Sequence, residues 1–334
     1  MNQWKWIAWT ALLLAASARA ETLEAFSARC DAAIGVTVPD FNCDSGTLVP
    51  TTNHTAPGTT SGTCDRPNVL NSQCDPGSRF QVLRDDPNAF IVAHCRKQQM
   101  GAGLYGDIAV IQHSRTSGAT CFYQALGSLN GNVRAPSRGT GGFWKTPAET
   151  AGIGCGGCHD NGALIRSPYL TQLSSIPNNP HRLPGSGDVL FNRDQPYFVV
   201  GEDFASWKFF KVEVDNNVCV GCHRMGVSNV RSGLGTSLDL GIRATNMNQT
   251  AKNPHSPTSP IWMTLDRRSL PAGMQWSDAN ARAALEIRNC AMRFRENPLP
   301  NAPSCRITET LGQPQPPVIV NPPFIPPPWL PAVL

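Results

Sequence analysis

The chain has 334 residues, and its 28 basic and 24 acidic side chains give a formal net charge of +4. So small an excess of positive charge gives no electrostatic basis for binding nucleic acid or an anionic membrane surface. The 29 glycines and 29 prolines, with few strongly periodic stretches, predict a loop-rich fold.

Residues 1–20 predict a secretory signal peptide. Lys5 precedes an apolar run at residues 6–16, which is shorter than the roughly 20 residues that span a bilayer. Small residues at the end of this segment form a cleavage pattern, so the mature chain is expected to begin near Glu21. An uncleaved membrane anchor is the alternative. Cleavage near Ala20 predicts a periplasmic, secreted or cell-surface protein without stable membrane insertion.

Eight of the 12 cysteines lie outside the two Cys-x-x-Cys-His motifs described below. An even number of cysteines in an exported chain predicts up to four disulfides. Proximity along the sequence favours the pairs Cys30 with Cys43, Cys64 with Cys74, Cys95 with Cys121, and Cys290 with Cys305.

Residues 21–134 predict a disulfide-rich, partly β N-terminal region. Strand-like runs occur at residues 89–95, 106–113 and 121–126. The Gly/Ser-rich stretch at residues 135–142 is a natural boundary to the part of the chain that follows.

The second half of the chain contains one predicted strand and one predicted long helix. Residues 208–214 alternate as a strand does and stop at an Asn-Asn turn. Residues 277–297 have apolar residues at helical spacing, Ser277 as a cap and Pro298 as a stop. The proline-rich tail at residues 313–334 is expected to be extended, either as a strap on its own domain, without structure, or docked on a partner.

Two short motifs share one pattern, in which a histidine directly follows a Cys-x-x-Cys pair. They consist of Cys155, Cys158 and His159, and of Cys219, Cys222 and His223. This is the attachment pattern of c-type haem, in which two thiols add to the vinyl groups and the histidine is the proximal iron ligand. A zinc ribbon is the first alternative, but it prefers pairs roughly 15 to 20 residues apart and leaves the histidines unexplained. A thioredoxin-like dithiol is the second alternative, but neither copy lies in a βαβ setting.

With the signal peptide, these motifs resemble those of exported bacterial dihaem c-type cytochromes. The resemblance covers the two motifs and little else of the chain. It implies two covalent haem c groups, redox partner proteins and a dihaem cytochrome c domain at residues 135–312. The expected fold is therefore mixed and loop-rich, with the partly β N-terminal region followed by a mainly α or irregular haem region.

The second axial ligands of the two irons have several candidates. For the haem at the second motif we expect Met263 or His255, which share a proline-stiffened loop. For the haem at the first motif we expect His113, which ends a strand-like run, or His181. Each of these residues could instead be an ordinary polar residue that a hydrogen bond satisfies.

The predicted function is electron transfer between redox partners through two haems. A dihaem oxidoreductase similar to bacterial cytochrome c peroxidases, with one haem open to substrate, is the alternative, although that family places its motifs farther apart. Its catalytic residues are unknown, and Asp160 and Arg224 are candidates only because they adjoin the motifs. A docking protein within a larger electron conduit is a third possibility.

Overall fold

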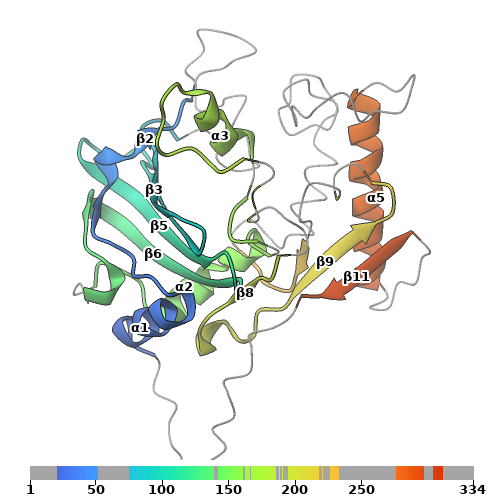
Figure 1. Ribbon diagram of the computed structural model, residues 1–334, viewed down its shortest axis with the longest axis horizontal. Coiled ribbons are helices and arrows are strands. Elements are labelled where there is room, and N and C mark those ends of the chain that lie inside the picture. The colour runs from blue at the N-terminus through green and yellow to red at the C-terminus, as the bar shows by residue number, and fades with distance from the viewer. Residues whose placement is uncertain are drawn as a thin grey trace, which may run out of the picture.

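A six-stranded sheet in the order β2-β3-β4-β5-β6-β8 is the centre of the computed structural model (Figure 1). Its strands are β2 (Thr47–Leu48), β3 (Arg79–Asp85), β4 (Ala89–Arg96), β5 (Leu104–Ser114), β6 (Ala119–Asn130) and β8 (Phe198–Val199). All neighbours are antiparallel except β6 and β8, which are parallel. The structure describes residues 21–51, 75–138, 142–160, 162–165, 167–185, 188, 190, 195–217, 220, 226–232, 276–296 and 304–310.

The three strands predicted in the N-terminal region are confirmed as β4, β5 and β6. One face of this sheet packs against helix α1 (Leu23–Ile34), which Thr22 caps and Gly35 ends in the left-handed conformation. The buried Phe26 of α1 meets Tyr123 of β6 edge to face, with ring centroids 5.5 Å apart. Burial of such aromatic side chains supplies much of the energy that holds a helix on a sheet.

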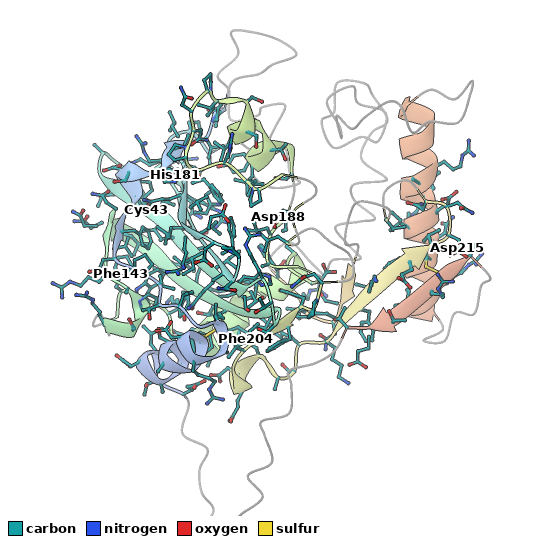
Figure 2. All side chains as sticks on the ribbon, viewed as in Figure 1. Cys43, Phe143, His181, Asp188, Phe204 and Asp215 are labelled. Carbon is teal, nitrogen blue, oxygen red and sulfur yellow. A yellow bond between two sulfur atoms is a disulfide. The ribbon has the colours of Figure 1, made fainter. Side chains whose placement is uncertain are left out.

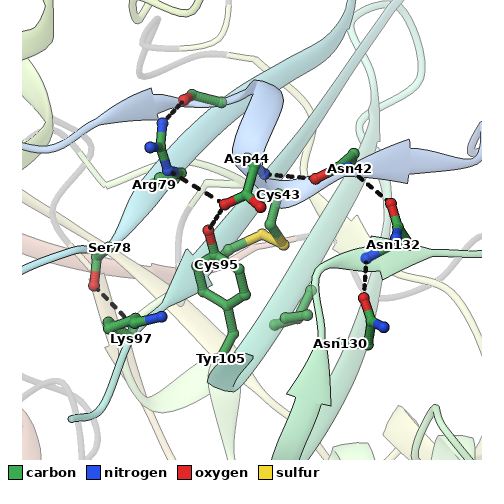
Figure 3. Close-up of a disulfide and its surroundings, with 12 residues drawn as sticks. Asn42, Cys43, Asp44, Ser78, Arg79, Cys95, Lys97, Tyr105, Asn130 and Asn132 are labelled. Carbon is green, nitrogen blue, oxygen red and sulfur yellow. Dashed lines mark hydrogen bonds and ion pairs between the residues drawn. A yellow bond between two sulfur atoms is a disulfide. The ribbon is translucent and has the colours of Figure 1, made fainter. Parts of the chain in front are cut away.

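Two disulfides join this sheet to the preceding chain, and their pairing differs from the predicted one. Cys30 of α1 is bonded to Cys121 of β6, and Cys43 is bonded to Cys95 of β4 (Figure 3). The predicted pairs Cys30 with Cys43 and Cys95 with Cys121 are therefore wrong. The strand β5 lies between β4 and β6, so Cys95 and Cys121 are at least two strand spacings apart, more than about 10 Å. That distance exceeds the reach of a disulfide, about 7 Å between Cα atoms.

The C-terminal part of the described residues forms a second sheet, in the order β10-β9-β11, with the long helix α5 beside it (Figure 1). The strands are β9 (Phe209–Val214), β10 (Gly226–Ser228) and β11 (Cys305–Glu309), and the helix is α5 (Trp276–Glu296). The strand at 208–214 and the helix at 277–297 are thus confirmed. The predicted bond between Cys290 and Cys305 is also confirmed, and it ties α5 to β11.

Shorter elements complete the fold. They are β1 (Phe41–Asn42), η1 (Cys43–Ser45), β7 (Asn132–Val133), η2 (Pro136–Arg138), α2 (Pro147–Ile153), η3 (Cys155–Gly157), α3 (Pro168–Thr171), η4 (Gln172–Ser175) and η6 (Glu202–Phe204).

The described residues form a mixed, disulfide-bonded fold that is largely β. The expectation of a mainly α or irregular cytochrome region at residues 135–312 is wrong, because β8, β9, β10 and β11 lie there. Three disulfides fit a protein of the periplasm or the cell exterior, where thiols are oxidised. Within the described ranges, no helix has the length and apolar character to cross a bilayer. The signal peptide, the pair Cys64 with Cys74 and the proline-rich tail lie outside those ranges.

Candidate functional site

The first motif follows directly on the short helix α2. Thr146 and Glu149 form a capping box at the start of α2, in which each side chain bonds the other's backbone N–H. The helix ends at Gly154 with φ +77°, and a Cβ atom there would lie 2.3 Å from the carbonyl oxygen of Arg231. Only glycine fits both that backbone angle and that approach. The chain therefore turns sharply into η3, where the motif begins at Cys155.

The motif lies on the sheet face opposite to α1. The ring of His159 is 5.4 Å from the ring of Phe122, which belongs to β6 and points away from the α1 side. Between the two cysteines, Gly156 is in close contact with Trp207 and Phe209, since a Cβ atom there would lie 2.7 Å and 2.9 Å from their rings. The rings of Trp207 and Phe209 thus pack directly against the backbone of the motif.

The orientation of His159 is fixed by its own hydrogen bonds. Its Nδ1 bonds the carbonyl oxygen of Ala163 at 2.8 Å, so Nδ1 carries the proton and donates it. Tyr197 donates from its hydroxyl to the backbone carbonyl of His159 at 2.6 Å. Burial lowers the pKa of His159 to about 4, although the Ala163 carbonyl acts in the other direction. At neutral pH the imidazole is therefore uncharged, with Nε2 as the basic nitrogen that a metal ligand requires.

Cys155 and Cys158 are the unbonded cysteines of the described residues, in which six others form disulfides. Burial raises the pKa of each thiol to about 11, and for Cys158 the charge of Asp160 adds to this effect. Redox dithiols instead have a lowered thiol pKa, because the thiolate is the attacking species. The environment of these two thiols therefore does not favour the thioredoxin-like alternative.

A zinc site is not supported either. Within the described part of the chain, no group of three or more His, Cys, Asp or Glu side chains could hold a metal ion. Cys155, Cys158 and His159 therefore do not converge on one point together with a further donor. Structural zinc needs four such donors around one centre.

A charged pair lies on the sheet near the motif. Arg96 of β4 donates to Asp107 of β5 at 2.9 Å, and both point to the face that carries Phe122. The positive charge of Arg96 acts on the pKa of Cys155, Cys158 and His159. Arg96 is therefore within electrostatic reach of the whole motif.

Several predicted site residues lie outside the described residues. They are Cys219, Cys222 and His223 of the second motif, the candidate ligands Met263 and His255, and Arg224. The strand β9, predicted to lead into the second motif, ends five residues before Cys219.

The two ligands predicted for the first haem are both described, and both have structural hydrogen bonds. His181 accepts at Nδ1 from the backbone N–H of Val82 at 3.2 Å and donates from Nε2 to the carbonyl of Ser45 at 3.1 Å. Figure 2 labels His181 near Cys43 of η1, in agreement with its bond to Ser45 of the same element. Because both ring nitrogens are used, this position leaves no lone pair for iron. His113 is buried on β5, and its Nδ1 bonds the hydroxyl of Thr120 at 2.8 Å.

Asp160, the other residue beside the first motif, is buried against Gly226 of β10. A Cβ atom at Gly226 would lie 2.4 Å from a carboxylate oxygen of Asp160. Asp160 therefore lies between the motif and β10, and its charge acts on the thiol of Cys158.

No family model matches the chain, and no curated protein and no solved structure matches it. The resemblance to exported bacterial dihaem c-type cytochromes is therefore wrong as a family assignment. The largely β fold, the three disulfides and the missing cluster of metal donors among the described residues contradict it. The physical reason is that a five-residue motif specifies a local chemistry, whereas the fold depends on the rest of the chain.

Proposed function

We propose that the first motif is a site of covalent haem attachment through Cys155 and Cys158, with His159 as an axial ligand, and that the protein transfers electrons. The observation that carries this proposal is the partition of the cysteines. In the described residues six cysteines are bonded across the fold, and the two that remain, Cys155 and Cys158, form the Cys-x-x-Cys pair that directly precedes His159.

Adjacent free thiols are unusual in an oxidising compartment. Addition of each S–H group across one of the two haem vinyl groups would form two thioether bonds, which would consume both thiols without joining them to each other. The raised pKa of both thiols does not favour a redox dithiol, and among the described residues no set of donors converges on a zinc ion.

His159 fits its role through the hydrogen bond that it already makes. A histidine that ligates iron commonly donates its other ring N–H to a carbonyl, which fixes the ring and makes the ligating nitrogen more basic. The bond from Nδ1 to the carbonyl of Ala163 is of this kind. When bound, a haem supplies one-electron chemistry by changing between ferric and ferrous iron. The chain's own contribution is to hold the ring of His159 in place and, through the rings of Trp207 and Phe209, to exclude water from the motif.

The test is to map haem on peptides. The protein is produced for export in a host with haem-attachment machinery, digested with trypsin and analysed by mass spectrometry. Cleavage after Lys145 and Arg166 gives one peptide with Cys155, Cys158 and His159. We expect this peptide to carry the mass of one haem and to lose it in the C155A/C158A variant.

The second motif supplies a matched control. The variant C219A/C222A should keep the haem on the peptide 146–166, and the pyridine haemochrome spectrum gives the amount per chain. If that peptide instead returns from the exported protein without haem, with two alkylatable thiols or a bond between them, the proposal is wrong. Attachment of a second haem at Cys219, Cys222 and His223 stays a prediction that the same digest tests.

A further inference from the structure

Part of the sheet face opposite to α1 is covered by one short segment of the chain. We call residues 167–185, which contain α3 and η4, the strap. Buried apolar side chains of the strap form one cluster with buried side chains of β3 and β4. The members of this cluster include Tyr169, Leu173 and Leu183 of the strap and Phe80, Phe90 and Val92 of the sheet. The strap thus makes a small core of its own on this face.

Hydrogen bonds tie the strap to the edge of the sheet. The hydroxyl of Thr47 in β2 donates to the side chain of Asn179 at 2.6 Å. The side chain of Gln172 donates to the carbonyl of Pro50 at 3.0 Å. His181 accepts at Nδ1 from the backbone N–H of Val82 in β3. The strap is therefore a docked element with its own apolar and polar contacts, of the kind that can open without unfolding the sheet beneath it.

His94 of β4 lies between the strap and the sheet. Its Nε2 bonds the hydroxyl of Tyr169 at 3.2 Å. The centroid of its ring is 5.6 Å from that of Tyr169 and 6.2 Å from that of Phe80. A histidine in this position is enclosed only as long as the strap is closed.

The groups around His94 disfavour a proton on its ring. The uncharged residues that face it are Phe80 of β3, Ala109 of β5 and Tyr169 of the strap. Arg96, on the same face of β4, is a cation, and its partner Asp107 of β5 is bonded to it. Asp75, whose charge acts on Tyr169, is bonded to Ser78. Burial, and after it the charge of Arg96, lowers the pKa of His94 well below its ordinary value of 6.5.

We propose that the strap is an acid-sensitive cover of the sheet, which opens when His94 takes up a proton. The closed strap requires a neutral ring, whereas water can solvate the charged ring once the strap is open. The stability that the neutral ring gives to the closed form is complete above about pH 6.5 and is lost as the pH falls below it. His181 acts in the same direction, because a protonated Nδ1 can no longer accept the bond from Val82.

This opening takes place next to the first motif. The strap begins four residues after Ala163, whose carbonyl holds the ring of His159. The inference itself does not depend on the proposed haem attachment, since every contact that carries it lies in the strap and the sheet.

Hydrogen exchange of the exported protein at pH 7 and pH 5, followed by mass spectrometry, tests the proposal. Protection factors are compared, because they already correct for the direct effect of pH on exchange. Peptides within residues 167–185 should lose at least about 20-fold in protection. This is the ratio for one histidine with an ordinary pKa of 6.5 that takes up its proton only in the open form. Peptides of β5 should keep their protection.

The variant H94Q keeps a side chain that can bond Tyr169 but cannot be protonated, so its loss between pH 7 and pH 5 should be about 20-fold smaller. H94F, which keeps a flat ring in the same place, is the second variant if H94Q does not fold. The matched control is Y169F, which removes the hydroxyl and should lower the protection of the strap by the same factor at both pH values.

Three results would overturn the proposal. The first is a strap whose protection in the parent protein is the same at pH 7 and pH 5. The second is an equal loss in the parent protein and in the variants of His94. The third is a loss of protection in β5 together with the strap, which would show that acid unfolds the whole sheet.

Discussion

Replacing Cys43 and Cys95 with alanine should destabilise the protein by about 3 to 4 kcal/mol. The bond encloses 52 residues, and closing a free loop of that length corresponds to about 4 kcal/mol of chain entropy. The bond between Cys30 and Cys121 already encloses residues 43–95 and restricts the unfolded chain. The loss of the second bond therefore costs somewhat less entropy than it would in an otherwise free chain. Urea unfolding at neutral pH, followed by circular dichroism, gives the difference between the variant and the parent protein.

The single variant C43A tests the pairing itself. If Cys43 is bonded to Cys95, removal of one partner breaks the bond, and adding C95A should change the stability little further. The variant C290A/C305A serves as a control in the other sheet, where a separation of 15 residues corresponds to about 3 kcal/mol. A non-reducing peptide map that joined Cys30 to Cys43 would refute the reasoning outright.

Three further predictions concern the first motif. G156A should cost about 1 to 3 kcal/mol in urea unfolding, because the added methyl group overlaps two aromatic rings; an unchanged midpoint would contradict the close contact. In haem-free protein, burial lowers the pKa of His159 from 6.5 to about 4, so the unfolded chain binds the proton first. The stability that this gives is present above about pH 6.5 and is lost as the pH falls toward 4. Between pH 7.5 and 4.5, H159Q should therefore lose about 2 to 3 kcal/mol less than the parent protein, and equal losses would rule this linkage out. Cys155 and Cys158 of folded haem-free protein should react with iodoacetamide far more slowly at pH 8 than after unfolding in urea, because their pKa is raised to about 11; equal rates would show that they are not buried.

The sequence predicted those parts of the fold that are encoded locally. Short runs rich in β-branched and aromatic residues at 89–95, 106–113 and 121–126 identified three central strands, since such residues favour strands. The strand β3 was missed, because most of its side chains are half-buried or exposed and two arginines interrupt its pattern. The bond between Cys290 and Cys305 was predicted because its partners are isolated in the sequence.

Contacts between distant segments were not predictable in the same way. The pairing of Cys30 with Cys121 depends on how α1 lies across the sheet, and a one-residue slip of a strand would turn its cysteine to the other face. The same reason explains why the ion pair of Arg96 with Asp107 was not predicted. It depends on the register of β4 on β5, which no local pattern contains.

Successive side chains of a strand point to opposite faces of the sheet, and this alternation couples the disulfides to the candidate site. Cys95 lies between His94 and Arg96, so its side chain points toward α1 while theirs point toward the motif. Cys121 stands in the same relation to Phe122, the residue that contacts His159. Each disulfide therefore fixes a strand from the face toward α1, and the neighbouring side chains of Arg96 and Phe122 lie on the opposite face.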